Sequence, residues 1–331
     1  MALVSVPKLL LAPMVELSHR ALRELIAGFG GCERYYTEMV SASGYLHGNR
    51  FDQWFTDTAP KPENTAVQFF DSRADAIIDA CKKLYDERAA NGISLGGVDL
   101  NFGCSAPFIE RSGGGVYWMK DPQKAASLVA KLKKLFPGLV LSAKIRLGYE
   151  ESLEILGNFC IGLEEAGLDY LVVHPRLKHE KFRRKGRWHY VARLAELIKI
   201  PLIGNGDIRS FQDYKKAMDK YKPSGIMIGR EAARQPWLFS LINAKEKDAE
   251  FRIHVNIMES GIKMLELIKK CLPEEFYLSR AKRFFFYFCD NLSFSHHLRF
   301  AIQNSTSMDQ IESLWLSYFK ELPADISRVF L

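Results

Sequence analysis

The sequence predicts an α/β fold, a (β/α)8 TIM barrel followed by a C-terminal α-helical bundle. Eight strand-like apolar segments lie between residues 8 and 230, and helical segments alternate with them. Regular strand–helix alternation implies a parallel sheet. Beyond about residue 243 the strand signal stops and the pattern is helical. We therefore expect a barrel domain over residues 1–243 and a helical domain over residues 244–331.

The expected strands are short and mostly apolar. The N-terminal run has no basic n-region and no small-residue cleavage site, so we interpret it as the first strand and not as a signal peptide. The segments 139–145 and 225–229 are nearly continuous apolar runs, which is typical of parallel strands buried on both faces. In chain order, the expected strands cover residues 8–14, 35–39, 65–70, 96–104, 139–148, 170–176, 200–207 and 225–230.

Helical segments with recognisable ends separate these strands. Asp121 and Ser210 are good N-caps, and Pro122 suits a first helical turn. Gly138 and Gly167 follow helical patterns, at positions where a left-handed cap is expected. The segment 39–65 is predicted to be irregular. The expected barrel helices are 19–28, 73–90, 121–135, 151–166, 188–199 and 210–220, and the C-terminal helical patterns are 254–272, 278–292 and 307–322.

The net charge of +7 is concentrated in one segment. Residues 176–187 contain seven Lys or Arg and one Glu. Taken alone, such a run favours a solvated loop. Here it follows His174 at an expected strand end, which places it at the rim of a barrel site. A basic rim suits a polyanionic substrate such as nucleic acid.

The six cysteines are widely scattered, and none forms a CxxC pair. This spacing indicates neither a zinc site nor a disulfide framework, and it fits a reducing, cytoplasmic setting. No stretch approaches the apolar length of a membrane span. We expect no metal ion, no membrane partner and a monomer.

Polar residues at the strand ends indicate an active site, because barrel enzymes build their sites from the carboxyl ends of the strands. Lys144 lies near the end of a buried strand, where an unpaired ammonium is unfavourable, so it needs an anionic partner. That partner can be a carboxylate, a phosphate or a reduced flavin ring. Gln68 can both donate to and accept from a heteroaromatic ring, although a satisfied amide at the barrel mouth is an equally good interpretation.

The last two strands predict a phosphate site. Gly204, Gly206 and Gly229 allow close approach of a ligand to the backbone, and Arg230 adds a positive charge. Barrels commonly bind phosphate between these two strands.

Cys104 stands three residues beyond Asn101, at the start of a glycine-rich segment. Its thiol can act as a nucleophile, which requires a low pKa, or as a proton donor, which requires it to stay protonated. A buried spacer is the plain alternative for any single cysteine. A glycine-rich loop over the site favours a functional role.

Taken together, the segments at the strand ends resemble those of the tRNA-dihydrouridine synthases. The similar segments are LAPMVELSHRALREL, YTEMV, VQFF, DLNFGC, AKIRLG, VVHPR, IPLIGNGDI and GIMIGREAARQPWLF, and AKRFFFYFCDNL is similar to the family's C-terminal domain. The resemblance covers essentially the whole chain. It implies an FMN-containing barrel and a helical tRNA-binding domain. It also implies that FMN, reduced by NADPH or NADH, passes a hydride to C6 of a uridine in tRNA while a cysteine protonates C5.

The resemblance assigns roles to individual residues. Cys104 matches the general acid. The residues that would hold FMN are Pro13, Met14, Val15, Gln68, Lys144, His174, Asn205, Gly206, Asp207, Gly229 and Arg230. The residues that would contact the uridine or the tRNA are Glu38, Asn101, Arg146, Arg176, Arg183, Arg184, Lys185, Arg280, Lys282, Arg283 and Arg299.

Two other functions stay open at this point. An FMN barrel ene-reductase acting on a small molecule would share the phosphate strands but would not need the basic run or the helical tail. The other is a tRNA-binding flavoprotein without turnover, against which the presence of Cys104, Lys144 and Gln68 argues. The aromatic run 284–288 suits base stacking, but five consecutive aromatic residues cannot all face one side of a helix, so we expect most of them in the core.

Overall fold

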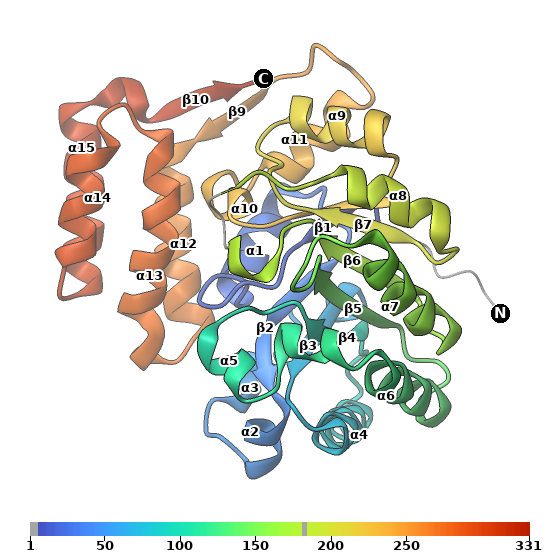
Figure 1. Ribbon diagram of the computed structural model, residues 1–331. Helices are drawn as coiled ribbons and strands as arrows, with labels where there is room; N and C mark the ends of the chain where they lie inside the picture. The colour runs from blue at the N-terminus through green and yellow to red at the C-terminus, as the bar shows by residue number, and fades with distance from the viewer. Residues whose placement is uncertain (1–5, 181–183) are drawn as a thin grey trace.

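A closed barrel of eight parallel strands forms the larger part of the molecule (Figure 1). This computed structural model describes residues 6–180 and 184–331, so Arg183 lies outside the described residues. The predicted (β/α)8 fold is confirmed. The strands are β1 (Leu9–Leu11), β2 (Tyr35–Ser41), β3 (Thr65–Phe70), β4 (Gly97–Phe102), β5 (Leu141–Arg146), β6 (Tyr170–His174), β7 (Leu202–Asn205) and β8 (Gly225–Ile228).

The strands follow one another around the barrel, and β8 pairs with β1 through Leu9–Ile226, Leu10–Met227 and Leu11–Ile228. Between β1 and β2 the contact is an isolated parallel bridge of Leu10 with Arg34. The Leu11 amide donates to the Arg34 carbonyl at 2.9 Å. The barrel is therefore closed, and this seam is its shortest pairing.

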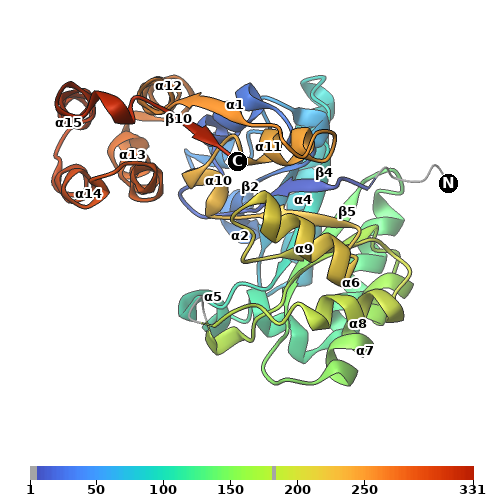
Figure 2. The same cartoon turned by 90° about the horizontal axis from the view of Figure 1, so that it is seen from above.

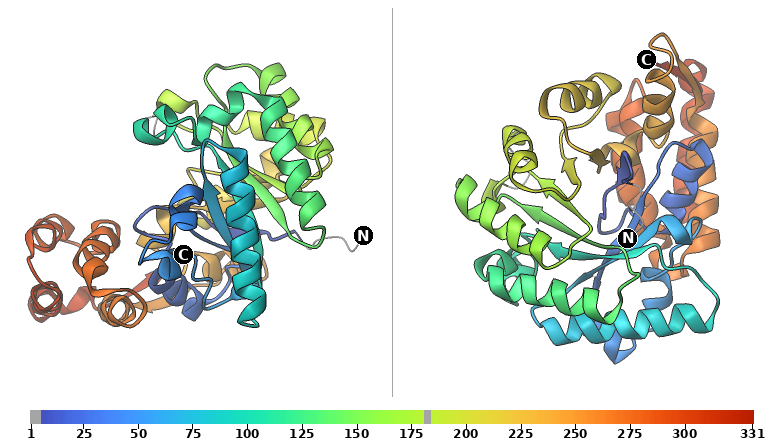
Figure 3. Two further views of the ribbon diagram at one scale, coloured as in Figure 1. Left: turned by 90° about the horizontal axis from the view of Figure 1, so that it is seen from below. Right: turned by 90° about the vertical axis from the view of Figure 1, so that its right-hand side faces the viewer.

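The outer helices surround the strands, as the right-hand view of Figure 3 shows. Asp121 and Ser210 cap α6 and α9, as predicted, by accepting from the amides of Lys124 and Asp213. Gly167 has the expected positive φ of 94°. The prediction for Gly138 is wrong, because α6 already ends at a cap on Phe136 with φ −130°. These helices are α1 (Arg20–Phe29), α4 (Ala74–Ala90), α6 (Pro122–Leu135), α7 (Leu153–Glu165), α8 (His189–Leu197), α9 (Phe211–Tyr221) and α11 (Leu238–Lys245).

Several short helical turns lie in the loops. The segment predicted as irregular, 39–65, contains α2 (Ala42–His47), α3 (Asp52–Phe55) and the 3-10 turn η1 (Pro62–Asn64). That prediction is wrong because helices of a single turn or two leave too little periodicity to be recognised in a sequence. The other turns are α5 (Pro107–Arg111), η2 (Gly115–Lys120), η3 (Lys178–Glu180) and α10 (Glu231–Arg234).

Four helices beyond the barrel pack beside it, and Figure 2 views them end-on. They are α12 (Ile257–Cys271), α13 (Glu274–Phe288), α14 (Ser295–Asn304) and α15 (Met308–Glu321), with the 3-10 turns η4 (Cys289–Asn291) and η5 (Pro323–Asp325). The expectation that strands stop after residue 243 is wrong. An antiparallel pair, β9 (Ile253–Asn256) with β10 (Ser327–Phe330), joins the two ends of this helical region. Each strand has only four residues and is half-exposed, so neither has a strong apolar signal.

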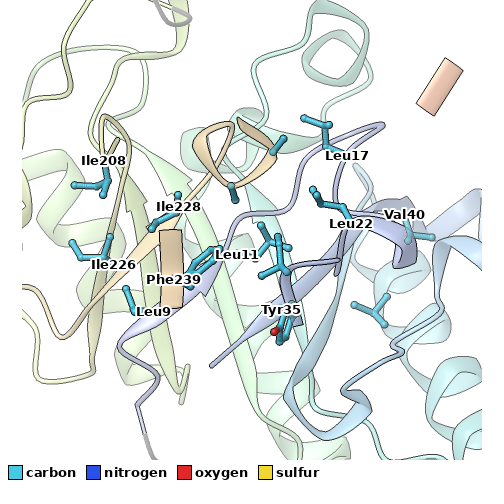
Figure 4. Packing of buried hydrophobic residues seen from close by; sticks show 14 of the residues in the cluster. Leu9, Leu11, Leu17, Leu22, Tyr35, Val40, Ile208, Ile226, Ile228 and Phe239 are labelled. Carbon is cyan, nitrogen blue, oxygen red and sulfur yellow. The ribbon is translucent and has the colours of Figure 1, made fainter. Parts of the chain in front are cut away.

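The cores of the barrel and of the helices follow the expected periodicities. Leu9 and Leu11 of β1 point outward, where Figure 4 shows them with Ile226, Ile228 and Phe239. Alternate residues fill the barrel interior, namely Leu10, Ala12, Tyr36, Ala66, Tyr170, Val172, Ile203 and Met227. In α13, as predicted for most of the aromatic run, the buried members are Phe284, Phe285 and Phe288, whereas Phe286 is exposed.

Candidate active site

A cavity of ≈ 890 Å³ opens at the carboxyl ends of the barrel strands. A smaller cavity of ≈ 430 Å³ lies at the opposite end and contains none of the predicted site residues. The predicted residues that line the larger cavity are Pro13, Met14, Val15, Gln68, Asn101, Cys104, Lys144, Arg146, His174, Arg176, Asn205, Gly206, Asp207, Gly229, Arg230 and Arg283. All predicted cofactor residues and the predicted acid therefore share one cavity.

Lys144 is placed in this cavity by β5. Within residues 6–180 and 184–331 its ammonium makes no hydrogen bond or ion pair. Burial and the nearby Arg146 guanidinium lower the pKa of Lys144 to about 8, and Asp99 partly opposes this shift. A half-buried cation that faces a cavity and has no bound partner is suited to an anionic ligand. The sequence prediction for Lys144 thus agrees with its surroundings.

Gln68 and Asn101 form one hydrogen-bonded unit on the cavity wall. The Asn101 side-chain NH2 donates to the Gln68 carbonyl oxygen at 2.9 Å. The Gln68 NH2 donates to Asp99 at 2.6 Å, below the cavity. Burial raises the pKa of Asp99 to about 6, and the hydrogen bonds from Gln68 and Ser142 counteract part of that effect.

Cys104 follows this unit directly and is half-buried. Its amide donates to Oδ1 of Asn101 at 2.8 Å, and its carbonyl accepts from the amide of Val116 at 2.9 Å. Gly115, with φ 56°, packs so closely on the Cys104 carbonyl that no Cβ fits there. The glycine-rich segment after Cys104 is thus folded back onto it and forms the turns α5 and η2.

The ends of β7 and β8 form a cradle with little side-chain bulk. Gly206 has φ 118°, and a Cβ there would lie 3.0 Å from the His174 ring. At Gly229 a Cβ would come within 3.7 Å of the Met14 sulfur. Asn205 donates to the Met227 carbonyl at 2.8 Å and so joins the two strand ends. With Arg230 beside it, this cradle fits a phosphate group, because backbone amides and a fixed cation are what phosphate sites require.

Arg176 lies inside the cavity wall and not on the basic rim where the sequence placed it. It is 3% exposed, and its guanidinium pairs with Asp207 at 2.5 Å. It also contacts His174 Nε2 at 2.9 Å. Because an arginine can only donate, Nε2 must be the acceptor and the His174 proton sits on Nδ1. Burial and the charge of Lys144 hold the pKa of His174 well below its usual value, so the ring is neutral.

Three other residues predicted to contact the uridine or the tRNA, Glu38, Arg280 and Arg299, are paired within the protein. Glu38 does not line the cavity. Its carboxylate accepts from the Glu16 amide at 2.5 Å and lies 3.7 Å from Arg280, which is 7% exposed. Arg299 pairs with Asp290 and lies over the Phe286 ring, 5.5 Å from its centroid. Sequence position alone could not reveal these pairs, because each joins segments far apart in the chain or on successive helices.

Three further predicted tRNA contacts, Arg184, Lys185 and Lys282, do not line the cavity. Arg184 and Lys185 are exposed, and Arg184 lies 3.7 Å from Glu180. Lys282 is half-buried on α13, and its carbonyl accepts from Gln303 at 2.8 Å.

Twelve residues that line the cavity escaped the sequence prediction, and those with long polar or polarisable side chains are Met39, Arg209, Glu231, Arg234 and Tyr287. Tyr287 follows Arg283 by four residues on α13, and the two side chains stack with 5.5 Å between the guanidinium carbon and the ring centroid. That spacing places residues on one helix face, so helical periodicity from Arg283 could have found Tyr287. Arg209, Glu231 and Arg234 lie in a loop and a one-turn helix, which carry no such signal.

Among the described residues, no group of three or more His, Cys, Asp or Glu side chains is placed to hold a metal ion. All six cysteines are free. None of the helices in the described ranges is both long and apolar enough to cross a membrane.

Comparisons with known proteins find one enzyme family and a shared barrel fold. The family model described as "Dihydrouridine synthase (Dus)" matches residues 10–321. The "Probable tRNA-dihydrouridine synthase" of Aquifex aeolicus is 30% identical over 83% of this chain and 82% of its own length. The "tRNA-dihydrouridine(16) synthase" of Pseudomonas syringae pv. tomato is 30% identical over 72% of this chain and 76% of its own length. A crystal structure of TcOYE with pHBA shares the fold, with a TM-score of 0.50 and 11% identity over 72% of this chain and 89% of that chain.

Proposed function

This chain belongs to the dihydrouridine synthase family, and from that membership we propose that it reduces the C5–C6 double bond of uridine in tRNA with FMN as its resident cofactor. It is a tRNA-dihydrouridine synthase, an oxidoreductase. The observation that supports the proposal most strongly is that Cys104, the partnerless ammonium of Lys144 and the glycine cradle share one cavity.

The residues around this cavity fit FMN. The Gly206 and Gly229 cradle with Arg230 suits the phosphate, and Lys144 suits the electron-rich edge of the ring. Further residues that would hold the cofactor are Pro13, Met14, Val15, Gln68, His174, Asn205 and Asp207. Asp207 can lie near a phosphate because Arg176 neutralises its carboxylate. When bound, FMN supplies a hydride for C6 of the uracil after taking it from NADPH or NADH.

Cys104 donates the proton in this proposal. Its half-buried thiol faces the cavity, and its backbone is held on two sides, by Asn101 and by Val116. A neutral thiol can deliver a proton to C5 near physiological pH. Asn101 and Arg146 line the same wall and are the proposed contacts to the uracil. The uridine must leave the tRNA stack to enter the cavity.

The helical region contributes the remaining tRNA contacts in this proposal. The expected domain boundary, between residues 243 and 244, falls inside α11, so we place the start of the tRNA-binding domain beyond that helix. Arg283 and Tyr287 of α13 reach the cavity, and the half-buried Lys282 and the exposed Arg184 and Lys185 are further proposed contacts. Because Arg280 and Arg299 are paired within the protein, we propose that they hold α13 and α14 in place. We further propose that the enzyme acts as a cytoplasmic monomer.

The names of several relatives suggest the target position. Relatives in Pseudomonas syringae pv. tomato and Cupriavidus necator, at 30% and 29% identity, are named tRNA-dihydrouridine(16) synthases. We propose uridine 16 of tRNA as the target here. Mass spectrometric mapping of tRNA treated with the purified enzyme tests this: dihydrouridine at another position, and none at 16, contradicts it.

A spectroscopic experiment tests the proposed activity. The purified protein should show the visible spectrum of FMN, and NADPH should bleach it. Without oxygen, unmodified tRNA should then reoxidise the flavin and free uridine should not. Reoxidation by a small enone but not by tRNA would indicate a small-molecule reductase, and bound flavin that no substrate reoxidises would indicate a binding protein.

The Cys104→Ala substitution tests the acid. We expect this variant to bind FMN normally but to lose about a hundredfold or more in the rate of tRNA reduction, since general acids typically contribute 10²–10⁴-fold. Cys32→Ala is the matched control, because Cys32 is also half-buried but lies at the other end of the barrel. Wild-type turnover in Cys104→Ala would exclude its role as the acid.

A further inference from the structure

Asp99 of β4 is a fully buried carboxylate with 0% exposure, and it lies beneath the cavity without lining it. The register of β3, β4 and β5 sets Gln68 and Ser142 on either side of it. Both carboxylate oxygens are used: Ser142 donates to Oδ1 at 2.5 Å and Gln68 donates to Oδ2 at 2.6 Å. A buried carboxylate is unfavourable compared with an apolar side chain of similar size. Its presence in the barrel core therefore calls for an explanation beyond packing.

The hydrogen bonds that begin at Asp99 run in one direction to Cys104. The Gln68 carbonyl oxygen accepts from Asn101 at 2.9 Å. Oδ1 of Asn101 then accepts from the amide of Cys104 at 2.8 Å and from that of Gly103 at 3.2 Å. Three side chains thus connect the barrel core to the backbone of the proposed acid.

The groups at the two ends of this series of hydrogen bonds determine which way the amide side chains between them are oriented. At one end an ionised carboxylate can only accept, so it draws the NH2 group of Gln68 toward itself. At the other end backbone amides can only donate, so they draw the oxygen of Asn101. Both constraints demand the same orientation of the two amide side chains between them. If the Gln68 amide were reversed, its oxygen would face the carboxylate of Asp99 and its NH2 would face the NH2 of Asn101.

We propose that Asp99 is a positioning residue for Cys104: by fixing the amide orientations of Gln68 and Asn101, it holds the Cys104 backbone where the thiol can reach the substrate. The proposal rests on the proposed function insofar as Cys104 is the acid. Asp99 itself touches no substrate. Asp99 contributes by fixing which end of each amide side chain, Gln68 and Asn101, donates and which accepts.

Three substitutions separate this role from simple packing. Asp99→Leu keeps a side chain of similar size but removes the acceptor. Asp99→Asn can keep an oxygen toward Gln68 while its NH2 donates to Ser142, whose hydroxyl can also accept. Ser142→Ala is the matched control, because it disturbs the same buried cluster on the side that does not lead to Cys104.

The first readout is the alkylation of Cys104 by iodoacetamide in FMN-free protein, followed by mass spectrometry of the peptide that contains it. We expect alkylation to be about threefold or more faster in Asp99→Leu. The segment that carries Cys104 is then held less tightly, so its thiol is exposed to the reagent more often. The second readout is tRNA reduction by the FMN-loaded enzyme, where we expect kcat to fall about tenfold to a hundredfold, since small misplacements have effects of that size. We expect an unchanged KM for tRNA, and Asp99→Asn and Ser142→Ala close to wild type in both readouts.

Wild-type alkylation and kcat in Asp99→Leu would overturn the proposal. The proposal would also be overturned if Asp99→Asn were as impaired as Asp99→Leu. The negative charge of Asp99, and not the orientation of the amide side chains, would then be what matters. If Asp99→Leu does not fold, Gln68→Met cuts the same chain one link nearer to Cys104, and an unchanged alkylation rate there is equally contrary. Alkylation needs no tRNA, so it tests the positioning even if the wild-type enzyme fails to reduce tRNA, which would contradict the proposed function alone.

Discussion

At the scale of single residues, some charged side chains of the cavity are paired with each other and others are not. The carboxylate of Asp207 is neutralised by Arg176, and that of Glu231 lies 3.2 Å from Arg234. Lys144 has no such partner among the described residues and has a lowered pKa. The free positive charge is thus concentrated where β5 ends, and an anionic group gains most by binding there.

The pH dependence of cofactor binding tests this view of Lys144. Its pKa in the ligand-free protein is about 8, below the usual value for lysine, so the ammonium loses its charge as the pH rises through 8. An anionic ligand favours the charged form and therefore binds best below that pH. We expect FMN affinity, measured by fluorescence titration, to fall by up to about tenfold per pH unit above 8.

Lys144→Met provides the control for that titration. It should bind FMN more weakly at pH 7 and lack the decline above pH 8 that belongs to the lysine. Any decline left in this variant reports on the flavin itself. Identical pH profiles for both proteins would show that Lys144 does not contact the charged cofactor.

At the scale of elements, the turns α5 and η2 are a brace for Cys104. Trp118 of η2 is buried and its indole NH donates to the Asp71 carbonyl at 2.7 Å. The same turn brings Gly115 against the Cys104 carbonyl. Phe108 of α5, by contrast, is 74% exposed. The brace is therefore anchored next to the acid, and the Phe108 side chain projects into solvent from its first half.

Substituting Gly115 tests the brace. In Gly115→Ala the added Cβ meets the Cys104 carbonyl, and the φ of 56° is unfavourable for alanine. We expect a loss of about 1–3 kcal/mol in the free energy of unfolding, together with slower tRNA reduction. Chemical denaturation and single-turnover kinetics measure the two effects.

Gly138→Ala is a matched control for this substitution, because a Cβ at Gly138 meets nothing within 4 Å. It should be neutral or slightly stabilising in the denaturation experiment. If both substitutions changed the free energy of unfolding equally, the contact of Gly115 with the Cys104 carbonyl would not be important for stability.

At the scale of the whole molecule, the barrel and the helical region share one cavity. Glu16, which follows β1, lies 3.5 Å from Arg280 and 3.8 Å from Arg283 of α13. On the other side, Asp290 pairs with both Arg234 of α10 and Arg299 of α14. These ion pairs fasten α13 beside the strand ends, so Tyr287 reaches the cavity from outside the barrel.

The salt dependence of tRNA binding tests the basic rim. Replacing Arg184 and Lys185 with alanine should weaken binding and reduce the slope of log K against log salt by roughly one per lost phosphate contact. A filter-binding assay over a range of salt concentrations measures both. The control replaces Lys131 and Lys134, which are exposed on α6, with alanine. If the two double variants have equal slopes, the rim is a solvated loop.

The sequence predicted much of this architecture because strand ends are local features. Lys144, His174 and Asn205 stand out as polar residues at the ends of apolar runs, and all three line the cavity. Pairing is not local. The sequence around Glu38 does not show that Arg280 will cover it, and the basic run does not show that Arg176 will turn inward. The β9–β10 pair was missed for the same reason, since its partners are 71 residues apart at Asn256 and Ser327.

The β9–β10 ladder also has an evolutionary consequence. It holds the entry and the exit of the four-helix segment side by side, about 5 Å apart. A segment whose two ends meet in this way can change between them without separating the strands of the barrel. Variation in this segment can therefore change the proposed tRNA contacts of α13, while those on the barrel rim stay as they are.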